Sequence, residues 1–164
     1  MTQAVIATVL QDAFWQAGER LMLRHTNPWE LDEALTDWGY TLGPCEAQDL
    51  LGLDKVLARL PDRPVPILPR MVAEGRMGKI GGVGFYRYPG GGGAVIDPLI
   101  EDLIREEAWF AKVDRTELGN DELVTAMNAA LLRTRDGLVA AGHPSEDIDA
   151  ALAEAVHFPP DRRL

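Results

Sequence analysis

The spacing of apolar residues along the chain predicts helices. From Ala4 to Arg24, apolar side chains recur every third or fourth position, which is typical of one long amphipathic helix. Its apolar positions are Val5, Ile6, Val9, Leu10, Ala13, Phe14, Ala17 and Leu21. The first element is therefore expected to be one continuous helix.

A second, shorter helix is expected after it. Asn27 can cap this helix, because Pro28 takes the first helical position and Glu30 follows three residues after the cap. Its apolar face consists of Leu31, Ala34, Leu35 and Trp38. Gly39 and Gly43 end it, since glycine interrupts helices.

Proline and glycine also divide the next part of the chain. Pro44 can open a third helix, whose apolar spacing continues to Leu60 with an interruption at Gly52. Residues 61–69 are rich in proline and are expected to form a rigid turn. A fourth helix should follow this turn and end at Gly75.

Two more helices are expected in the second half. Asp97 and Pro98 can begin one that continues to about Phe110, and apolar spacing predicts another over 121–142. No stretch alternates steadily between apolar and polar residues, as a half-buried strand would. The predicted fold class is all-α.

A glycine-rich stretch separates the two halves. Residues 78–93 are dominated by glycine and aromatic residues, and the run over 89–93 has the composition of a flexible connector. We therefore expect a first helical unit over 1–88, a linker over 89–96 and a second unit over 97–164.

The two units contain a weak internal repeat. Residues 28–35 resemble 144–152 with one insertion. Each copy follows a long amphipathic helix, and each leads into a small turn, at 39–44 and at 156–160. The pattern predicts two copies of one helical unit, with the second copy cut short at Leu164.

Composition narrows the possible functions. The chain has 164 residues, a net charge of -10 and 46% hydrophobic residues, enough for one core or for two small units sharing one. Such an acidic surface argues against nucleic acid, because phosphates are bound by Lys and Arg. No apolar run approaches the roughly 20 residues needed to span a membrane. Residues 1–4 contain no basic signal-peptide region, so we expect a cytoplasmic protein.

Candidate chemical groups have simpler structural explanations. The glycine-rich stretch could cradle a phosphate, but a nucleotide loop needs a strand before it and a helix after it. We favour a packing role for Phe85, Tyr86 and Tyr88 there. Cys45 could be a reactive thiol at a helix start, although a small core residue is the favoured interpretation.

Other titratable residues also suggest structural roles. None of His25, His143 and His157 has cysteines or carboxylates at metal-ligand spacing, so no metal site is expected. His157 could act as a base, but nothing in the sequence supplies its nucleophile. Asp32 and Asp49 lie near turns, where capping is the expected role.

Two segments carry a family resemblance. Residues 42–54, with the sequence LGPCEAQDLLGLD, and 75–88, with GRMGKIGGVGFYRY, match in order and spacing the C-terminal helical domain of the 3-hydroxyacyl-CoA dehydrogenases. The resemblance extends over 4–88 and more weakly over 121–160. It implies a duplicated helical unit similar to the dimerisation domain of 6-phosphogluconate dehydrogenase.

The resemblance also implies a function and its limits. In that family a separate nucleotide-binding domain carries the catalytic His and Glu, and this chain holds no such domain. We therefore expect no cofactor in this chain, NAD only through a partner domain, and no activity of the isolated chain. An acyl-CoA ligand, a homodimer and an NAD-binding dehydrogenase subunit are the implied partners.

By resemblance, Thr8 occupies the position of an active-site Asn of the family. A hydroxyl can still donate a hydrogen bond but lacks the second donor of the amide. Leu42, Gly43 and Pro44 are the implied substrate-binding residues. Two hypotheses remain open: a stand-alone part of a dehydrogenase of fatty-acid β-oxidation, or a non-catalytic helical module that dimerises or binds acyl-CoA.

Overall fold

A computed structural model describes residues 3–164 of the chain. Met1 and Thr2, which belong to the segment expected to lack a signal peptide, lie outside the described residues. Within 3–164 there are eight α-helices, one short 3-10 helix and no strand, so the all-α prediction is confirmed. The elements are α1 (Gln3–Arg24), α2 (Pro28–Trp38), α3 (Pro44–Leu51), α4 (Leu53–Arg59), α5 (Ile67–Ala73), η1 (Pro89–Gly91), α6 (Pro98–Phe110), α7 (Asn120–Ala140) and α8 (Ser145–Val156).

The capping signals correctly located most helix starts. Asn27 caps α2, and its side-chain oxygen accepts a 2.9 Å hydrogen bond from the Glu30 amide. Asp97 caps α6 in the same way, through a 3.1 Å bond from the Leu99 amide. Each of these side chains satisfies an amide that the helix itself cannot pair.

Helix α5 begins earlier than expected. It starts at Ile67, so Pro69 lies inside its first turn and does not belong to the turn before it. Proline is tolerated at this place because the first amides of a helix have no intrahelical acceptor. The expectation that the rigid turn extends to Pro69 is therefore wrong.

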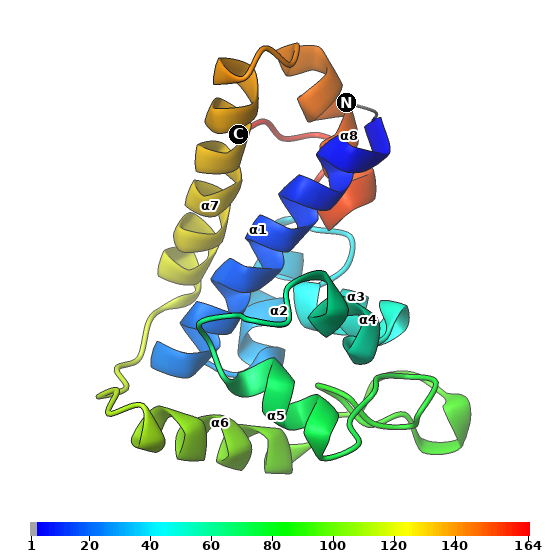
Figure 1. Ribbon diagram of the computed structural model, residues 1–164, viewed down its shortest axis with the longest axis vertical. Coiled ribbons are helices and arrows are strands. Elements are labelled where there is room, and N and C mark those ends of the chain that lie inside the picture. Colours follow the sequence, from blue (N-terminus) through cyan, green and yellow to red (C-terminus); the bar gives the residue numbers. More distant parts are fainter. Residues whose placement is uncertain (1–2) are drawn as a thin grey trace.

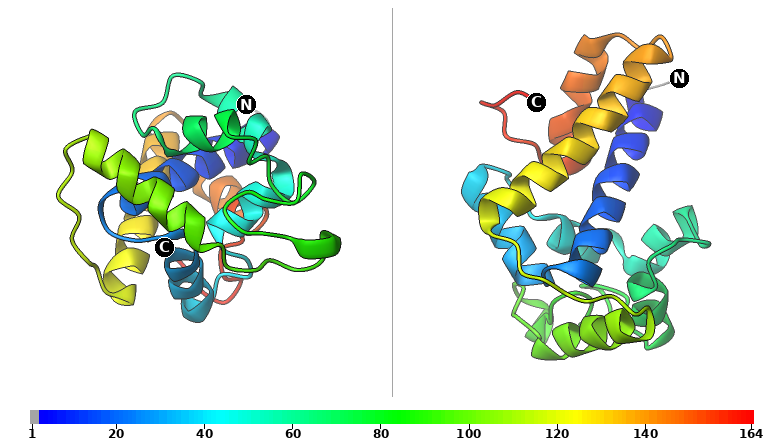
Figure 2. Two further views of the ribbon diagram at one scale, coloured as in Figure 1. Left: turned by 90° about the horizontal axis from the view of Figure 1, so that it is seen from below. Right: turned by 90° about the vertical axis from the view of Figure 1, so that its left-hand side faces the viewer.

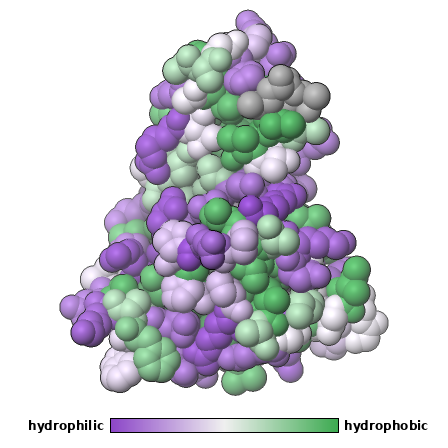
Figure 3. Space-filling model, in the orientation of Figure 1, coloured by the Kyte–Doolittle hydropathy of each residue, from purple (hydrophilic) through white to green (hydrophobic). Residues whose placement is uncertain are grey.

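Only part of the apolar face predicted for the long helix α1 is buried in the core. Ile6, Leu10 and Phe14 are buried, whereas Val5 and Val9 are 44% and 36% exposed. Figure 3 shows hydrophobic surface over the N-terminal half of this helix. The apolar face of α1 is wider than the surface that the neighbouring helices cover, so Val5 and Val9 stay exposed.

Helix α1 lies at the centre of the molecule. It packs against α7 and α8, while α2 packs against α7 and α6 crosses the base together with α5 (Figures 1 and 2). One continuous hydrophobic core contains side chains from both sides of residues 89–96. No helix within residues 3–164 is long and apolar enough to cross a membrane.

The stretch between α5 and α6 is irregular but fixed. Antiparallel bridges join Gly78 to Val83, Val83 to Arg87 and Arg87 to Val95. The bridge between Arg87 and Val95 closes the turn around η1 at its base, and this turn projects at the lower right of Figure 1. The aromatic residues of this stretch, Phe85, Tyr86 and Tyr88, are all buried, which confirms their packing role.

Candidate functional site

Asp49 of α3 binds the aromatic segment that follows α5. Its Oδ1 accepts a 2.8 Å hydrogen bond from the Phe85 amide, and its Oδ2 accepts bonds of 3.0 Å from the Tyr86 amide and 2.6 Å from the Tyr88 hydroxyl. Its backbone oxygen accepts a further bond from the Lys79 amide. One buried residue thus joins the two segments that carry the family resemblance.

Asp32 of α2 has a parallel role at the start of α3. Its two carboxylate oxygens accept hydrogen bonds of 2.9 Å from the Cys45 amide and 3.0 Å from the Glu46 amide. The Tyr86 hydroxyl donates a third bond, of 2.8 Å, to Oδ2. Because Tyr86 also bonds Asp49 through its backbone, the two carboxylates belong to one buried network.

Close approach explains several glycines in these segments. A Cβ atom on Gly43 would lie 2.3 Å from Cγ of Asp32, and one on Gly84 would lie 2.1 Å from Oδ1 of Asp49. Gly78 has a φ of +111°, and a Cβ atom on it would lie 2.5 Å from the Asp49 carbonyl oxygen. Only glycine fits where the backbone runs this close to the carboxylates.

Burial governs the protonation of the network. It raises the pKa of Asp32 to about 7 and that of Asp49 to about 6, against the lowering effect of the hydrogen bonds that each carboxylate accepts. Burial also raises the pKa of Tyr86 and Tyr88 far above the ordinary range. The tyrosine hydroxyls therefore act as donors, and both carboxylates are engaged inside the protein.

Cys45 is a core residue, as the favoured interpretation predicted. Its side chain is buried, and its sulfur lies 3.8 Å from the sulfur of Met22. Burial and the neighbouring Asp32 raise the pKa of the thiol. A buried, protonated thiol is a poor nucleophile.

Thr8 lies on the exposed side of α1. Its hydroxyl donates a 3.0 Å hydrogen bond to the Ala4 carbonyl oxygen, one turn earlier in the same helix. One turn later, Asp12 forms a 3.1 Å ion pair with Arg59 of α4. The position is therefore open to solvent, and the donor capacity of the hydroxyl is used within the helix.

The three residues implied to bind substrate lie elsewhere. Gly43 and Pro44 are buried and Leu42 is half-buried, directly before α3. The following residue, Cys45, contacts Met22, which is about 21 Å along α1 from Thr8 at 1.5 Å per residue. Thr8 and the start of α3 thus lie at different ends of α1.

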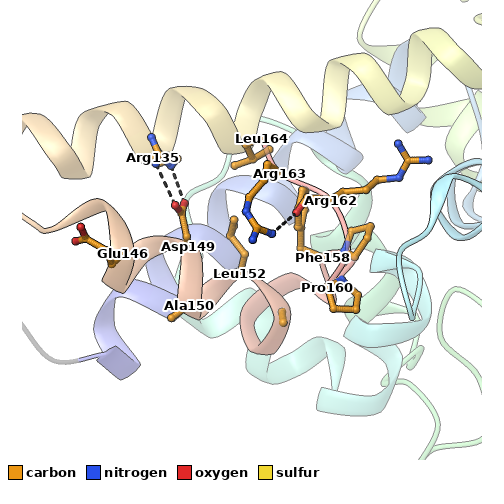
Figure 4. A pocket seen from close by; sticks show the side chains of 12 residues that line it. Arg135, Glu146, Asp149, Ala150, Leu152, Phe158, Pro160, Arg162, Arg163 and Leu164 are labelled. Atoms are coloured by element: carbon orange, nitrogen blue, oxygen red, sulfur yellow. Dashed lines mark hydrogen bonds and ion pairs between the residues drawn. The ribbon is translucent and has the colours of Figure 1, made fainter.

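A hollow lies over α8 and the residues that follow it (Figure 4). It has a volume of about 670 Å³. On its wall, Arg135 of α7 forms an ion pair with Asp149 of α8, with an Nε–Oδ1 distance of 2.8 Å. Arg162 turns away from the hollow, and its guanidinium lies 4.2 Å from the ring centre of Trp38.

The histidines do not assemble a metal site. No group of three or more metal-binding side chains is present in the part of the chain that the structure describes. The His25 ring is 3.0 Å from the carbonyl oxygen of Thr116. His157 ends α8 in the left-handed conformation, with a φ of +61°.

Sequence patterns missed a buried ion pair. Arg63, in the turn after α4, bonds Oε1 of Glu19 on α1, and both side chains are almost fully buried. Burial raises the pKa of Glu19 to about 7, although Arg63 acts in the opposite direction. The partners are 44 positions apart, and no local pattern indicates such a pairing.

A comparison with known families matches the part of the chain that contains the two segments joined by Asp49. The family model of the 3-hydroxyacyl-CoA dehydrogenase C-terminal domain matches residues 4–88. This chain therefore belongs to that family. The matched range includes Asp32, Asp49 and Tyr86, and so contains the whole buried network.

Similar proteins are larger than this chain. It is 28% identical over 153 residues to the fatty acid oxidation complex subunit alpha of Acinetobacter baumannii, covering 81% of this chain and 20% of that protein. It is 28% identical over 167 residues to the peroxisomal bifunctional enzyme of Danio rerio, covering 87% and 23%. The chain thus spans about a fifth of the length of these relatives.

A solved structure has the same fold. The dehydrogenase part of multifunctional enzyme 1 from Caenorhabditis elegans superposes with a TM-score of 0.77 at 19% sequence identity. The match covers 96% of this chain and 37% of that one. Almost the whole length of this chain therefore lies within the shared fold.

Proposed function

We propose that this chain is the acyl-CoA-binding helical part of a 3-hydroxyacyl-CoA dehydrogenase of fatty-acid β-oxidation. In this proposal a separate NAD-binding subunit supplies the oxidation chemistry. The observation that carries it is the family match over 4–88, in a chain that spans a fifth of its fatty-acid oxidation relatives.

The internal bonding of the family segments supports a dependent role. Every carboxylate oxygen of Asp32 and Asp49 accepts a hydrogen bond from an amide or a tyrosine, so neither group is placed to exchange protons with a substrate. The amides of Phe85 and Tyr86 are bonded to Asp49 and are not available to a phosphate. The engagement of these two amides supports the proposal that NAD is held by the separate subunit and not by the glycine-rich stretch.

The exposed side of α1 is the surface on which a catalytic partner would complete a site. Thr8 lies there, next to the exposed side chain of Val9. The surface of this half of the helix is partly hydrophobic (Figure 3). Exposed apolar side chains next to a polar position are typical of surfaces that bind another protein or a ligand.

The alternative is a non-catalytic helical module that holds acyl-CoA. The observation that favours it is the bond from the Thr8 hydroxyl to the Ala4 carbonyl, because this bond uses the only donor that the side chain has. A degenerate module would tolerate this arrangement, whereas a working active site needs a donor directed at its substrate.

Reconstitution distinguishes the two. The purified chain is mixed with an isolated NAD-binding domain of a fatty acid oxidation subunit, and NADH formation from a 3-hydroxyacyl-CoA is followed. We expect activity in the mixture and in neither component alone. Calorimetric binding of acyl-CoA without activity in any mixture would favour the module, and oxidation by the chain alone would contradict the proposal.

A further inference from the structure

A hollow of about 280 Å³ lies between α1 and α7, and it shares no residue with the hollow of Figure 4. The two helices pack side by side (Figures 1 and 2). The hollow is lined by Ala13, Gln16 and Arg20 of α1 and by Ala130, Arg133 and Thr134 of α7. None of these residues is acidic, although the whole chain has a net charge of -10. The hollow is therefore a local basic site on an acidic protein.

The two arginines of this hollow are exposed and have no partner in the chain. Within residues 3–164, neither the Arg20 nor the Arg133 guanidinium forms an ion pair or a hydrogen bond. Glu19, next to Arg20 in the sequence, is buried and is bonded to Arg63 instead. Both guanidinium groups therefore keep all of their N–H donors for a ligand.

Gln16 adds a neutral donor to the hollow. Its side chain is half-buried and has no hydrogen-bond partner among the residues that the structure describes. It lies one turn before Arg20 on the same face of α1. The Thr134 hydroxyl is different, because it already donates a 2.9 Å bond to the Ala130 carbonyl oxygen. The unpartnered donors thus come from the amide and the two guanidinium groups.

These groups match the chemistry of a phosphate. A guanidinium presents its N–H donors in a planar fork that fits phosphate oxygens, and a phosphate has oxygens enough to meet two such forks at once. A cationic ligand would meet two like charges and no carboxylate in this hollow. An apolar ligand would leave the donors without acceptors, which costs free energy. A hollow lined by charge of one sign also attracts ions of the opposite sign.

We propose that the hollow between α1 and α7 binds the phosphate group of an organic phosphate. Arg20 and Arg133 hold the phosphate from the two helices, and the Gln16 amide donates a further hydrogen bond. The site needs no second protein, because all of these groups belong to this chain.

The same face of α1 connects this site with an exposed apolar residue. Val9, Ala13, Gln16 and Arg20 follow each other at spacings of four, three and four positions, which places them on one face of the helix. Val9 is 36% exposed, and it lies about 16 Å along the helix from Arg20 at 1.5 Å per residue. A ligand with a phosphate at one end and an apolar chain at the other matches this face. Acyl-CoA is such a ligand, and only this choice of phosphate source rests on the proposed function.

Calorimetric titration of the purified full chain at low salt tests the site. The probes are inorganic pyrophosphate, coenzyme A and pantetheine, which has no phosphate. We expect pyrophosphate and coenzyme A to bind, more weakly as salt is added, and pantetheine not to bind. Binding of pyrophosphate without coenzyme A would support the phosphate site and reject acyl-CoA as its source. Pantetheine binding as tight as that of coenzyme A, or no binding of either phosphate at millimolar concentration, would overturn the inference.

Variants locate the bound phosphate. Arg20→Gln and Arg133→Gln should each weaken binding by about 10-fold or more, because each removes a charged donor. Gln16→Glu places a carboxylate in the hollow and should abolish binding. Arg87→Gln is the matched control, because it removes an exposed arginine from the turn around η1, and it should leave the affinity unchanged. Equal losses for the three arginine variants would mean attraction by overall charge and would contradict the site.

This test is independent of reconstitution, since it follows binding by the chain alone and not NADH formation. Phosphate binding at these residues with no activity in any mixture would keep the site and remove the catalytic proposal. Activity in a mixture without phosphate binding by the chain would keep the catalytic proposal and remove the site. Thermal unfolding of the variants checks that each remains folded, which is expected because both arginines are exposed.

Discussion

The Tyr86 hydroxyl donates a 2.8 Å hydrogen bond to Oδ2 of Asp32. Because Asp32 also accepts bonds from the first amides of α3, this bond connects the two segments of the family resemblance, 42–54 and 75–88. Tyr86 belongs to the irregular segment before α6, and Asp32 caps the start of α3 from α2. The backbone of the same tyrosine is bound by Asp49. Packing and hydrogen bonding within this chain therefore explain Tyr86, Asp32 and Asp49.

Removing a tyrosine hydroxyl from the network should destabilise the protein. Tyr86→Phe and Tyr88→Phe each take a donor away from a buried carboxylate, which costs about 2 kcal/mol. Tyr40→Phe is the matched control, because its hydroxyl bonds the neutral amide of Asn128, and it should cost about 1 kcal/mol. Urea unfolding of the three variants measures these values. A larger loss for Tyr40→Phe than for the other two would contradict the proposed importance of the network.

Replacing a glycine that lies against a buried carboxylate should destabilise the protein more than replacing a glycine with open space around it. Gly84→Ala and Gly43→Ala place a methyl group onto Asp49 and Asp32, so we expect losses of about 2 kcal/mol or more. Gly137→Ala is the control: it lies inside α7 with open space around it, and it should gain about 0.5–1 kcal/mol of stability. Thermal unfolding measures all three. Equal effects at the three positions would show that close packing is not the reason for these glycines.

Stability should fall as the pH rises from 5 to 8. The folded pKa values of Asp32 and Glu19 are raised to about 7, and that of Asp49 to about 6, from ordinary values of 3.8 and 4.5. Between the ordinary and the folded pKa values, the folded protein thus binds more protons than the unfolded chain. The resulting stabilisation is lost as the pH rises through the folded pKa values. Each of the three groups should contribute a loss on the order of 1 kcal/mol per pH unit.

Urea unfolding across this pH range measures the slope. Asp32→Asn should be less stable than the unmodified chain, with a smaller dependence on pH, since one of the titrating groups is gone. A free energy of unfolding that rises from pH 5 to pH 8 in the unmodified chain would mean that burial does not dominate the pKa of these carboxyls.

Breaking the buried ion pair should cost more than breaking an exposed one. Arg63→Met leaves Glu19 buried without its partner, and losses of about 3 kcal/mol are typical for such changes. Arg135→Met removes the half-buried partner of the exposed Asp149 and should cost less than about 1 kcal/mol. The double change Glu19→Leu with Arg63→Met should recover much of the loss. A double variant as unstable as Arg63→Met alone would refute this account.

Thr8→Asn tests the position of the family's active-site residue. In the reconstituted mixture, an added amide donor directed at the substrate should raise the rate by about 10-fold or more. Thr134→Asn is the matched control, because its hydroxyl makes the same bond to a carbonyl one turn earlier, at 2.9 Å, on α7. The measurement is the rate of each variant divided by the rate of the unmodified chain. Equal rates for both variants would remove Thr8 from the proposed site.

Local sequence determined the helices and many of their ends. Asn27 and Asp97 cap α2 and α6 as expected, since a cap needs only residues within one turn of each other. The core stripe of Ile6, Leu10 and Phe14 follows from helical spacing for the same reason. The packing of Tyr86 and Tyr88 was also predicted, because the glycine-rich stretch lacks the sequence context of a nucleotide loop.

Tertiary structure decided which groups those residues meet. The sequence predicted a capping role for Asp32, but not that it would cap α3 from another helix, or that Asp49 would bind amides 36 positions away. The Glu19–Arg63 pair and the exposure of Val5 and Val9 likewise depend on how elements distant in sequence pack together. Local residue patterns limit the angles and faces of one helix, whereas partners across the fold are chosen by the packing of the whole core.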